Sequence, residues 1–336
     1  MFLTEAGVVH YLVEQRFVDI ADVVGGEFRI HVVSRRNLNF RVAAGKRQYL
    51  VKQVRKWDAD GRASIEREAA VYWQAKTNPD LAPVAALAPE CHAWDPANAI
   101  LILEYLPAHT DLFDLTDRFD PAIASIAGKA MGCFHRAMRD EKHREQFPAE
   151  IPWYVSMHDI DPDDLKDESA GRKELLGAVR KYSQFGTALE RARVEWRAET
   201  VIQGDWKLGN CLIPAARDRL RLVDWEFACW GDPVWDLATL LQSYWNFWVL
   251  SPSQYRIEDI QPALRAVLEG YAQPGVSQKA IRFAGVRMLQ TAWECLDKAD
   301  RMTADAVRLM QASLNILTRP EWAAEQLLGQ HLQGMT

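Results

Sequence analysis

The sequence has few cysteines, no long apolar run and no excess of positive charge, and each shortage excludes a class of protein. Its 5 cysteines are odd in number, scattered and without the close spacing of metal ligands, so reduced thiols of a cytoplasmic protein are the simplest account. No apolar run approaches the roughly 18 residues that span a bilayer. Residues 1–18 lack a basic region followed by an uninterrupted apolar one, because Glu5 and Glu14 interrupt them. We therefore expect a soluble, cytoplasmic protein without a membrane partner.

Charge and length narrow the choice further. The formal net charge is −6, which argues against nucleic acid as the main partner. The 336 residues, 49% of them hydrophobic, provide an ample core for one two-lobed unit or two domains. The sequence contains no internal repeat or low-complexity tract. Both a monomer and a homodimer fit these observations.

The most informative segment is residues 203–210, which read Gln-Gly-Asp-Trp-Lys-Leu-Gly-Asn. Phosphoryl transfer from a nucleoside triphosphate needs a carboxylate that orients the attacking hydroxyl, and oxygen ligands that hold magnesium against the phosphates. Asp205, Asn210 and the later Asp224 supply this set. A bare Asp-x4-Asn match is common by chance, and the plain alternative makes Asp205 and Asp224 ordinary turn and strand-end carboxylates.

The surroundings of the segment strengthen the phosphoryl-transfer interpretation. Residues 211–213 and 220–223 are short apolar runs separated by turn-like composition, which predicts two strands joined by a tight hairpin. Asn210 then starts one strand and Asp224 ends the next. The predicted hairpin offers an amide oxygen and a carboxylate to the same hard cation, while Asp205 faces the acceptor.

Three segments together carry a family resemblance. Residues 203–210, the Asp-Trp-Glu triplet at 224–226 and the Gly-Asp-Pro-Val-Trp-Asp-Leu-Ala stretch at 231–238 resemble the catalytic loop, metal-binding segment and following helix start of the aminoglycoside phosphotransferase and choline kinase-like family. The family's usual motif begins His-Gly-Asp, and this chain has Gln203 in place of the His. That position supports loop geometry in the family. Since glutamine also donates and accepts hydrogen bonds, the departure affects geometry and rate more than chemistry.

The resemblance implies an α+β, bilobal, protein-kinase-like fold. A small β-rich lobe with one long helix, residues 1–104, would bind the nucleotide. A larger, mainly helical lobe, residues 105–336, would contain the catalytic loop and the acceptor site. Helical composition in the second lobe falls on residues 121–140, 170–199, 231–248, 258–272, 277–300, 303–317 and 320–333.

A nucleotide-binding lobe should contain a lysine and a paired glutamate. Residues 48–53 read as a strand ending near Lys52, after a turn at 44–46. Residues 65–73 have a helical pattern. The resemblance implies that Lys52 grips phosphate and pairs with Glu68, with Glu66 as the fallback. Judged alone, Lys52 is an ordinary surface lysine.

The phosphate loop and the hinge complete the expected nucleotide site. Residues 33–42 resemble the family's serine-rich phosphate loop and lack the G-x-G-x-x-G pattern, so Ser34 and Asn37 would offer side-chain donors instead. The neighbouring arginines at 35–36 fit either phosphate contact or a solvated turn. Residues 99–107 resemble the inter-lobe hinge, where backbone groups of Glu104 and Leu106 would read the adenine. A buried strand without a ligand has the same sequence pattern.

The resemblance assigns the chemistry residue by residue. Asp205 acts as the catalytic base on the acceptor hydroxyl, Asn210 and Asp224 hold Mg²⁺, and ATP is the expected donor, although the sequence does not distinguish ATP from GTP. Lys207 either stabilises the transferred group or is a solvated loop lysine. Asp236 should hold the backbone of the catalytic loop, and His135 should be structural.

The resemblance implies that the acceptor is a small-molecule hydroxyl, on an amino sugar, an amino alcohol or a related metabolite. Residues 159–168 carry six carboxylates and one lysine, which suits either a cationic acceptor or a solvated helix start. Trp245, Trp248 and Trp293 would line a pocket or belong to the core. A peptide kinase and a nucleotide-binding pseudokinase are the alternative functions.

Overall fold

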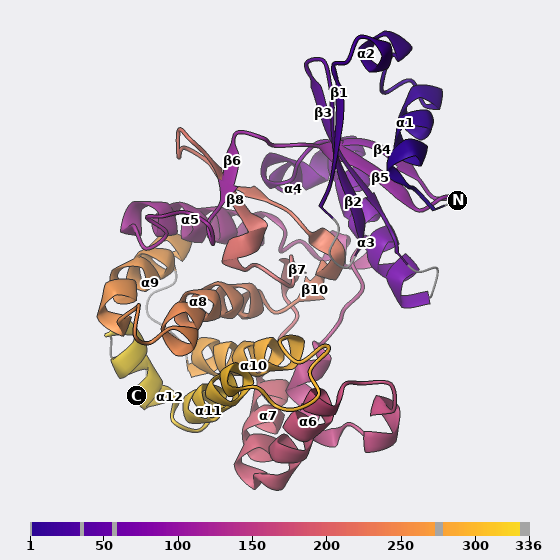
Figure 1. Ribbon diagram of the computed structural model, residues 1–336. Helices are drawn as coiled ribbons and strands as arrows, with labels where there is room; N and C mark the ends of the chain where they lie inside the picture. Colours follow the sequence, from indigo (N-terminus) through magenta and orange to yellow (C-terminus); the bar gives the residue numbers. More distant parts are fainter. Residues whose placement is uncertain (1, 34–36, 56–58, 273–277, 330–336) are drawn as a thin grey trace. The chain divides into compact units, whose positions relative to one another are not determined.

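The chain divides into two compact units, which are described separately (Figure 1). This computed structural model describes residues 2–33, 37–55, 59–272 and 278–329. The first unit consists of residues 1–110 with two later segments, 212–216 and 221–228, and the second unit consists of the remainder.

An antiparallel five-stranded sheet forms the centre of the first unit, in the order β1-β2-β3-β5-β4. The turn between β2 and β3 falls at the predicted position, and Gly45 adopts a φ of 57°, a conformation that costs glycine little. Because the second unit is mainly helical, the α+β fold class is confirmed. The strands are β1 (Phe28–Val32), β2 (Leu38–Ala44), β3 (Arg47–Gln53), β4 (Cys91–Asp95) and β5 (Ile100–Glu104).

The two faces of this sheet have different neighbours because side chains alternate along each strand. Tyr49 and Val51 of β3 belong to a core cluster with Leu12 of the first helix. Lys52 points to the opposite face, where its side chain meets the long helix α3. The sequence did not predict the two helices before β1. The helices of this unit are α1 (Glu5–Glu14), α2 (Ile20–Val24), α3 (Ala59–Thr77), the 3-10 turn η1 (Pro79–Leu81) and α4 (Ala82–Leu87).

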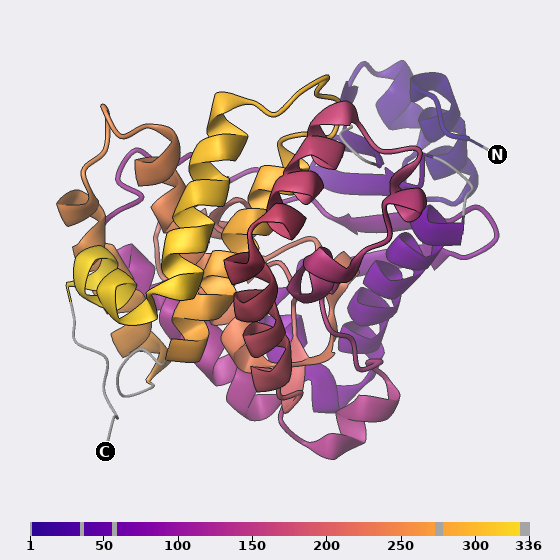
Figure 2. The same ribbon diagram turned by 90° about the horizontal axis from the view of Figure 1, so that it is seen from below.

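The second unit is built mainly from helices, as predicted. Its most buried helix is α8, and α10 and α11 lie side by side (Figure 2). The single helix expected over residues 170–199 is instead two helices, because Tyr182 adopts an extended conformation between them. The helices are α5 (Pro121–Ala137), α6 (Ala170–Lys181), α7 (Ser183–Glu195), α8 (Pro233–Leu250), α9 (Ile257–Tyr271), α10 (Gln278–Glu294), α11 (Ala304–Thr318) and α12 (Pro320–Ala323), followed by the π-helical turn η7 (Ala324–Leu328).

Helices α5 and α9 approach each other closely at glycines. A Cβ atom at Gly128 would lie 2.1 Å from the Val267 carbonyl oxygen, and one at Gly132 would lie 2.7 Å from the Tyr271 carbonyl oxygen. Gly270 makes the reciprocal approach to α5. Side chains larger than hydrogen would therefore push the two backbones apart.

Short strands and turns carry the segments around the predicted catalytic loop. Strands β7 and β10 pair antiparallel in the second unit. All five cysteines are free. Among the described residues, no helix is long and apolar enough to cross a membrane. The remaining elements are β6 (His109–Asp111), η2 (Glu141–Glu145), η3 (Trp153–Asp159), η4 (Pro162–Leu165), β7 (Thr200–Ile202), η5 (Leu208–Asn210), β8 (Cys211–Pro214), β9 (Arg221–Leu222), η6 (Trp225–Phe227) and β10 (Cys229–Gly231).

Candidate active site

The first unit contains a buried cluster of charge around Lys52. Both carboxylate oxygens of Glu68 accept hydrogen bonds from the Lys52 ammonium at 2.7 Å, and Asp224 Oδ1 accepts a third at 2.7 Å. The side chains of Lys52 and Glu68 are 5% and 1% exposed, whereas that of Asp224 is 50% exposed. The predicted ion pair is therefore present. The alternative partner, Glu66, lies on the exposed face of α3 and pairs with Arg62.

The cluster holds more negative than positive charge. Glu226 follows Asp224 closely in sequence and accepts a hydrogen bond from Ser64 of α3. Burial, together with the charges of Asp224 and Glu226, raises the pKa of Glu68 to about 7 against the opposing effect of Lys52. Burial alone would lower the pKa of Lys52, but the two neighbouring carboxylates outweigh it and raise that pKa. A cation placed beside Asp224 would offset this excess negative charge.

Asp224 is held in an uncommon backbone conformation. Its φ and ψ are 57° and 64°, in the left-handed region that aspartate tolerates better than most residues. It follows β9 and directly precedes η6, which packs against α3. The turn places the Asp224 carboxylate at the end of a strand, half exposed and next to Lys52.

In the second unit, the predicted catalytic loop is fixed by hydrogen bonds to its backbone. Asp236, in the first turn of α8, accepts hydrogen bonds from the amides of Gln203 and Gly204, both at 2.8 Å. The Gln203 side-chain oxygen accepts one from the Asp205 amide at 2.7 Å. Trp235 donates its indole N–H to the Gly204 carbonyl oxygen at 3.1 Å. The expectation that Asp236 holds the loop is confirmed, and Gln203 supports the loop from inside the core.

His135 stabilises the same loop from the side of α5. Its Nε2 lies 3.1 Å from Asp236 Oδ2, and its Nδ1 lies 2.9 Å from the hydroxyl of Tyr271 at the end of α9. Its carbonyl oxygen accepts a hydrogen bond from the hydroxyl of Thr200. The side chain is 3% exposed. Its contacts are those of a structural histidine, as expected.

Asp205, the carboxylate of the loop, is bonded through both of its oxygens. Its Oδ2 lies 2.6 Å from the Lys207 ammonium and accepts a hydrogen bond of 3.2 Å from the Asn210 amide nitrogen. Its Oδ1 accepts a hydrogen bond of 2.6 Å from Arg287 of α10. Burial alone would lower the pKa of Lys207, but the charge of Asp205 and the hydrogen bond to it outweigh burial and raise that pKa. Lys207 therefore remains a cation beside Asp205.

The side chain of Asn210 is oriented by hydrogen bonds of its amide nitrogen. Its amide nitrogen donates to the Asp205 carbonyl oxygen at 3.0 Å and to the Asp205 carboxylate at 3.2 Å. The amide oxygen therefore points away from Asp205. Among the described residues, no group of three or more His, Cys, Asp and Glu side chains could hold a metal ion. Magnesium commonly takes only one or two carboxylates and completes its shell with phosphate and water oxygens. The Asn210 amide oxygen is a ligand of this kind.

The other residues predicted to bind the nucleotide lie on strands and turns of the first unit. Asn37 is half-buried directly before β2. Glu104 ends β5, where its amide donates to the Glu90 carbonyl oxygen at 2.8 Å. Leu106 lies in the following turn, and its carbonyl oxygen accepts from the His109 amide at 3.2 Å. Ser34 and the adjacent arginines lie outside the described residues.

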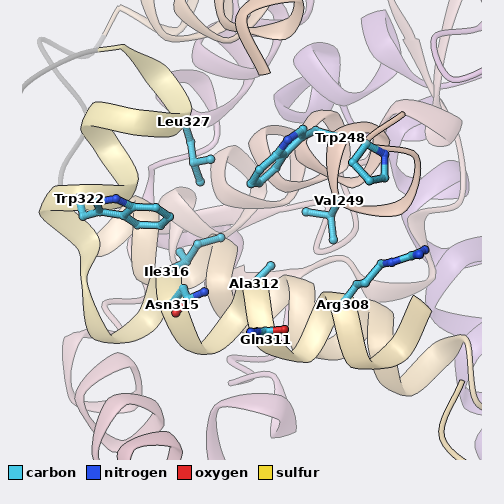
Figure 3. A pocket seen from close by; sticks show the side chains of 10 residues that line it. Trp248, Val249, Arg308, Gln311, Ala312, Asn315, Ile316, Trp322 and Leu327 are labelled. Carbon is cyan, nitrogen blue, oxygen red and sulfur yellow. The ribbon is translucent and has the colours of Figure 1, made fainter. Parts of the chain in front are cut away.

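The tryptophans proposed for an acceptor pocket have different environments. Trp245 is fully buried in the core, and Trp293 packs edge-to-face on Trp153. Trp248 lines a mostly apolar hollow of about 300 Å³ formed by the end of α8, α11, α12 and η7. Trp322 projects into the same hollow (Figure 3). No predicted catalytic residue lines it.

The acidic segment before α6 consists mostly of exposed side chains with local partners. Asp161 caps η4 by accepting from the Asp163 amide, and Glu168 pairs with Arg172 at 2.5 Å. These contacts are those of solvated turn and helix-start carboxylates.

Sequence reasoning missed the row of polar side chains on α10. Arg287 reaches Asp205, and its second terminal nitrogen donates to Gln290 at 2.5 Å. Gln290 in turn donates to Glu294 at 2.7 Å. The spacing of these residues places them on one face of the predicted helix. Nothing in the sequence indicates that this face meets Asp205, which precedes it by 82 residues.

Comparison with known proteins decides the family. The Phosphotransferase enzyme family matches residues 29–273, which is well over half of the chain. The chain belongs to the phosphotransferase enzyme family. A search of curated proteins gave no match. The assignment therefore rests on the family match together with the fold.

Solved structures show that this phosphotransferase has the kinase-like fold. A choline/ethanolamine kinase family protein from Mesorhizobium loti is 17% identical, with a TM-score of 0.61 over 96% of this chain and 98% of that chain. The choline kinase LicA from Streptococcus pneumoniae is 16% identical, with a TM-score of 0.57 over 92% and 98%. Spectinomycin phosphotransferase APH(9)-Ia, in complex with ADP and spectinomycin, is 11% identical, with a TM-score of 0.51 over 93% and 98%. At these identities the likeness concerns the fold.

Proposed function

We propose that this phosphotransferase moves the γ-phosphate of ATP to a hydroxyl group of a small molecule. The observation that carries the proposal is the geometry of the Asp205 loop. Its carboxylate is fixed at one oxygen by Arg287 and lies beside Lys207 and Asn210, in a loop whose backbone Asp236 clamps. A positioned carboxylate of this kind is what an attacking hydroxyl requires.

The residues have separate roles in this proposal. Asp205 orients the acceptor hydroxyl and takes its proton as the new O–P bond forms and the bond to the departing ADP breaks. Lys207 moves from Asp205 to the transferred phosphoryl group. Lys52 binds the α and β phosphates. Magnesium, held by Asn210 and Asp224, supplies charge neutralisation on the triphosphate when bound.

The nucleotide itself is assigned to residues 1–104. Backbone groups of Glu104 and Leu106 would read the adenine, and the side chain of Asn37 would approach the phosphates. The spectinomycin phosphotransferase with the same fold is in complex with ADP, which supports an adenine nucleotide as the cofactor. ATP is favoured over GTP on this ground.

The acceptor is assigned to residues 105–336, which contain the catalytic loop. We propose an alcohol that also carries an amine, such as an amino alcohol or amino sugar. The structural neighbours include kinases of choline and a phosphotransferase bound to spectinomycin. In the acidic segment at 159–168, Asp161 and Glu168 have local partners, so neither is assigned to this amine.

The test is ATP-dependent phosphorylation over a panel of amino alcohols and amino sugars, with and without magnesium. We expect transfer to at least one member, and loss of transfer in Asp205→Asn. Glu66→Gln is the matched control, because it removes an exposed carboxylate from α3 without touching the Lys52 cluster. Turnover that persists unchanged in Asp205→Asn would contradict the proposed chemistry.

A further inference from the structure

Arg287 is a buried cation in direct contact with the proposed catalytic carboxylate. Its side chain is 5% exposed, and its Nη2 lies 2.6 Å from Asp205 Oδ1. A buried guanidinium is costly to desolvate and is retained only where its partners are well placed. Its contact with Asp205 is therefore a specific feature of the site.

Two further contacts fix the Arg287 guanidinium. The indole of Trp235 lies against it, with 5.5 Å between the guanidinium carbon and the ring centre. Trp235 also donates to the Gly204 carbonyl oxygen, so one side chain supports both the arginine and the catalytic loop. Gln290 accepts from Arg287 Nη1 at 2.5 Å. With both terminal nitrogens bonded and one face stacked, the guanidinium has little freedom to move.

The two oxygens of Asp205 consequently differ. Oδ1 is bonded to a guanidinium that is packed and buried. Oδ2 is bonded to Lys207, whose side chain is 44% exposed, and accepts a longer hydrogen bond of 3.2 Å from the Asn210 amide nitrogen. The acceptor hydroxyl needs one open lone pair on a carboxylate oxygen. Of the two cations, the lysine is the more exposed, and in the proposed function it leaves for the transferred phosphoryl group and opens a lone pair of Oδ2. Oδ2 is then the oxygen that receives the proton.

We propose that Arg287 is a positioning residue that holds Asp205 by Oδ1 and reserves Oδ2 for the acceptor proton. This inference rests on the proposed function, since it assigns a role to Arg287 through Asp205. The proton passes from the acceptor oxygen to Oδ2 while Arg287 stays bonded to Oδ1. Removing the guanidinium lets the carboxylate rotate, and the productive orientation becomes one of several.

The chain provides a matched control on the same helix. Arg282 is also buried on α10 and forms an ion pair with Glu195 of α7, and the hydrogen bonds described for the two residues join them to each other and to Gln278, not to the loop at 203–210. Arg282→Met removes a buried ion pair without touching Asp205. It therefore reports what the loss of such a pair does to the fold alone.

The experiment compares Arg287→Met, Arg287→Lys and Arg282→Met by steady-state kinetics and urea unfolding. Turnover is measured with the acceptor found in the panel, or as phosphate release from MgATP to water. We expect Arg287→Met to lower kcat on the order of 100-fold with the KM for MgATP nearly unchanged. Arg287→Lys should recover part of kcat, because an ammonium can still reach Oδ1. A smaller Arg287→Ala variant should regain turnover with millimolar methylguanidinium.

The outcomes separate this inference from the proposed function. If Asp205→Asn loses turnover while Arg287→Met keeps the wild-type kcat, the role of Arg287 is wrong and the function stands. If Arg282→Met lowers kcat as much as Arg287→Met, or methylguanidinium restores nothing to a folded Arg287→Ala protein, the role is structural and the inference falls. If the wild-type protein turns over no MgATP with any acceptor or water, both fall together.

Discussion

Lys52 holds together a group of carboxylates that would otherwise repel one another. In the described part of the chain, the hydrogen bonds of the Glu68 carboxylate all come from the Lys52 ammonium. The same ammonium also bonds to Asp224. Buried pairs of this kind add little stability over apolar residues, but losing one partner leaves a charge without compensation. We therefore expect the residue to matter to the fold as well as to the proposed nucleotide binding.

We expect Lys52→Met to lower the free energy of unfolding by about 3–5 kcal/mol, because it strands the buried Glu68 carboxylate. The double variant Lys52→Met with Glu68→Leu should recover most of that loss. Urea unfolding at neutral pH measures both. Equal stabilities of the single and double variants would show that the stranded carboxylate is not the cause.

The raised pKa of Glu68, about 7 against an ordinary value of 4.5, predicts a pH dependence of stability. A folded pKa above the unfolded one means that the folded protein holds a proton that the unfolded chain has released, so stability falls as pH rises from about 4.5 through 7. Relative to Glu68→Gln, which does not titrate, the wild-type protein should lose stability over this window. Urea unfolding of both proteins at several pH values measures the difference, and parallel curves would contradict the prediction.

At the scale of elements, the catalytic loop depends on three helices that the sequence separates widely. Helix α8 supplies Asp236 and α5 supplies His135, while α10 supplies Arg287. Asp236 accepts hydrogen bonds from the Gln203 and Gly204 amides, which satisfies backbone groups that lie outside regular secondary structure. Small changes in helix position therefore reach the loop directly.

Gln203 provides the sharpest test of this arrangement. Its side-chain oxygen accepts from the Asp205 amide at 2.7 Å within a fully buried site. We expect Gln203→His to preserve or raise turnover, because an imidazole nitrogen can accept the same hydrogen bond. Gln203→Ala should lower kcat by about tenfold or more, since it leaves a buried amide unsatisfied. Steady-state kinetics distinguishes the two, and equal losses would count against a supporting role in the loop.

Several contacts of the site could be predicted because their residues stand in motifs that the sequence shows. The Asp236 contact with the loop, the β2–β3 turn and the Lys52–Glu68 pair each followed from spacing or from the family pattern. The Arg287 contact could not be predicted, because it depends on which face of α10 turns toward Asp205. The break at Tyr182 had no glycine or proline to announce it. The core position of Trp245 likewise depends on tertiary packing.

At the scale of the whole molecule, each unit contributes residues to the proposed function. Lys52 and Asp224 belong to the first unit, and Asp205 and Asn210 belong to the second. A ligand that binds only the folded protein stabilises it by mass action, by about 2.7 kcal/mol at 100 times its Kd. Nucleotide binding should therefore be visible as a thermal shift.

We expect ATP with magnesium to raise the Tm of the wild-type protein, and ATP with excess EDTA to raise it less, because EDTA removes the cation that we propose for Asn210 and Asp224. Lys52→Met should reduce the shift, whereas Glu66→Gln should keep it. Thermal denaturation at millimolar ATP provides the measurement. A flat response in the wild-type protein would indicate that no nucleotide binds.

The overall order of the fold was predictable, and some of its parts were not. A strand-rich start followed by helices gave the α+β class, and most helices of the second unit lie where their composition placed them. The helices α1 and α2 were missed, because their short amphipathic segments carry weak signals beside the strands that follow.

The glycine contacts between α5 and α9 set a limit on how this sequence can vary. Helix α5 carries His135 and α9 carries Tyr271. The His135 Nδ1 lies 2.9 Å from the Tyr271 hydroxyl, and the other ring nitrogen bonds to Asp236. In a library of random variants, Gly128 and Gly132 should tolerate almost no substitution, although neither touches a proposed ligand. Selection for the active site would then fix two glycines at a helix crossing. Neither glycine takes part in any chemistry.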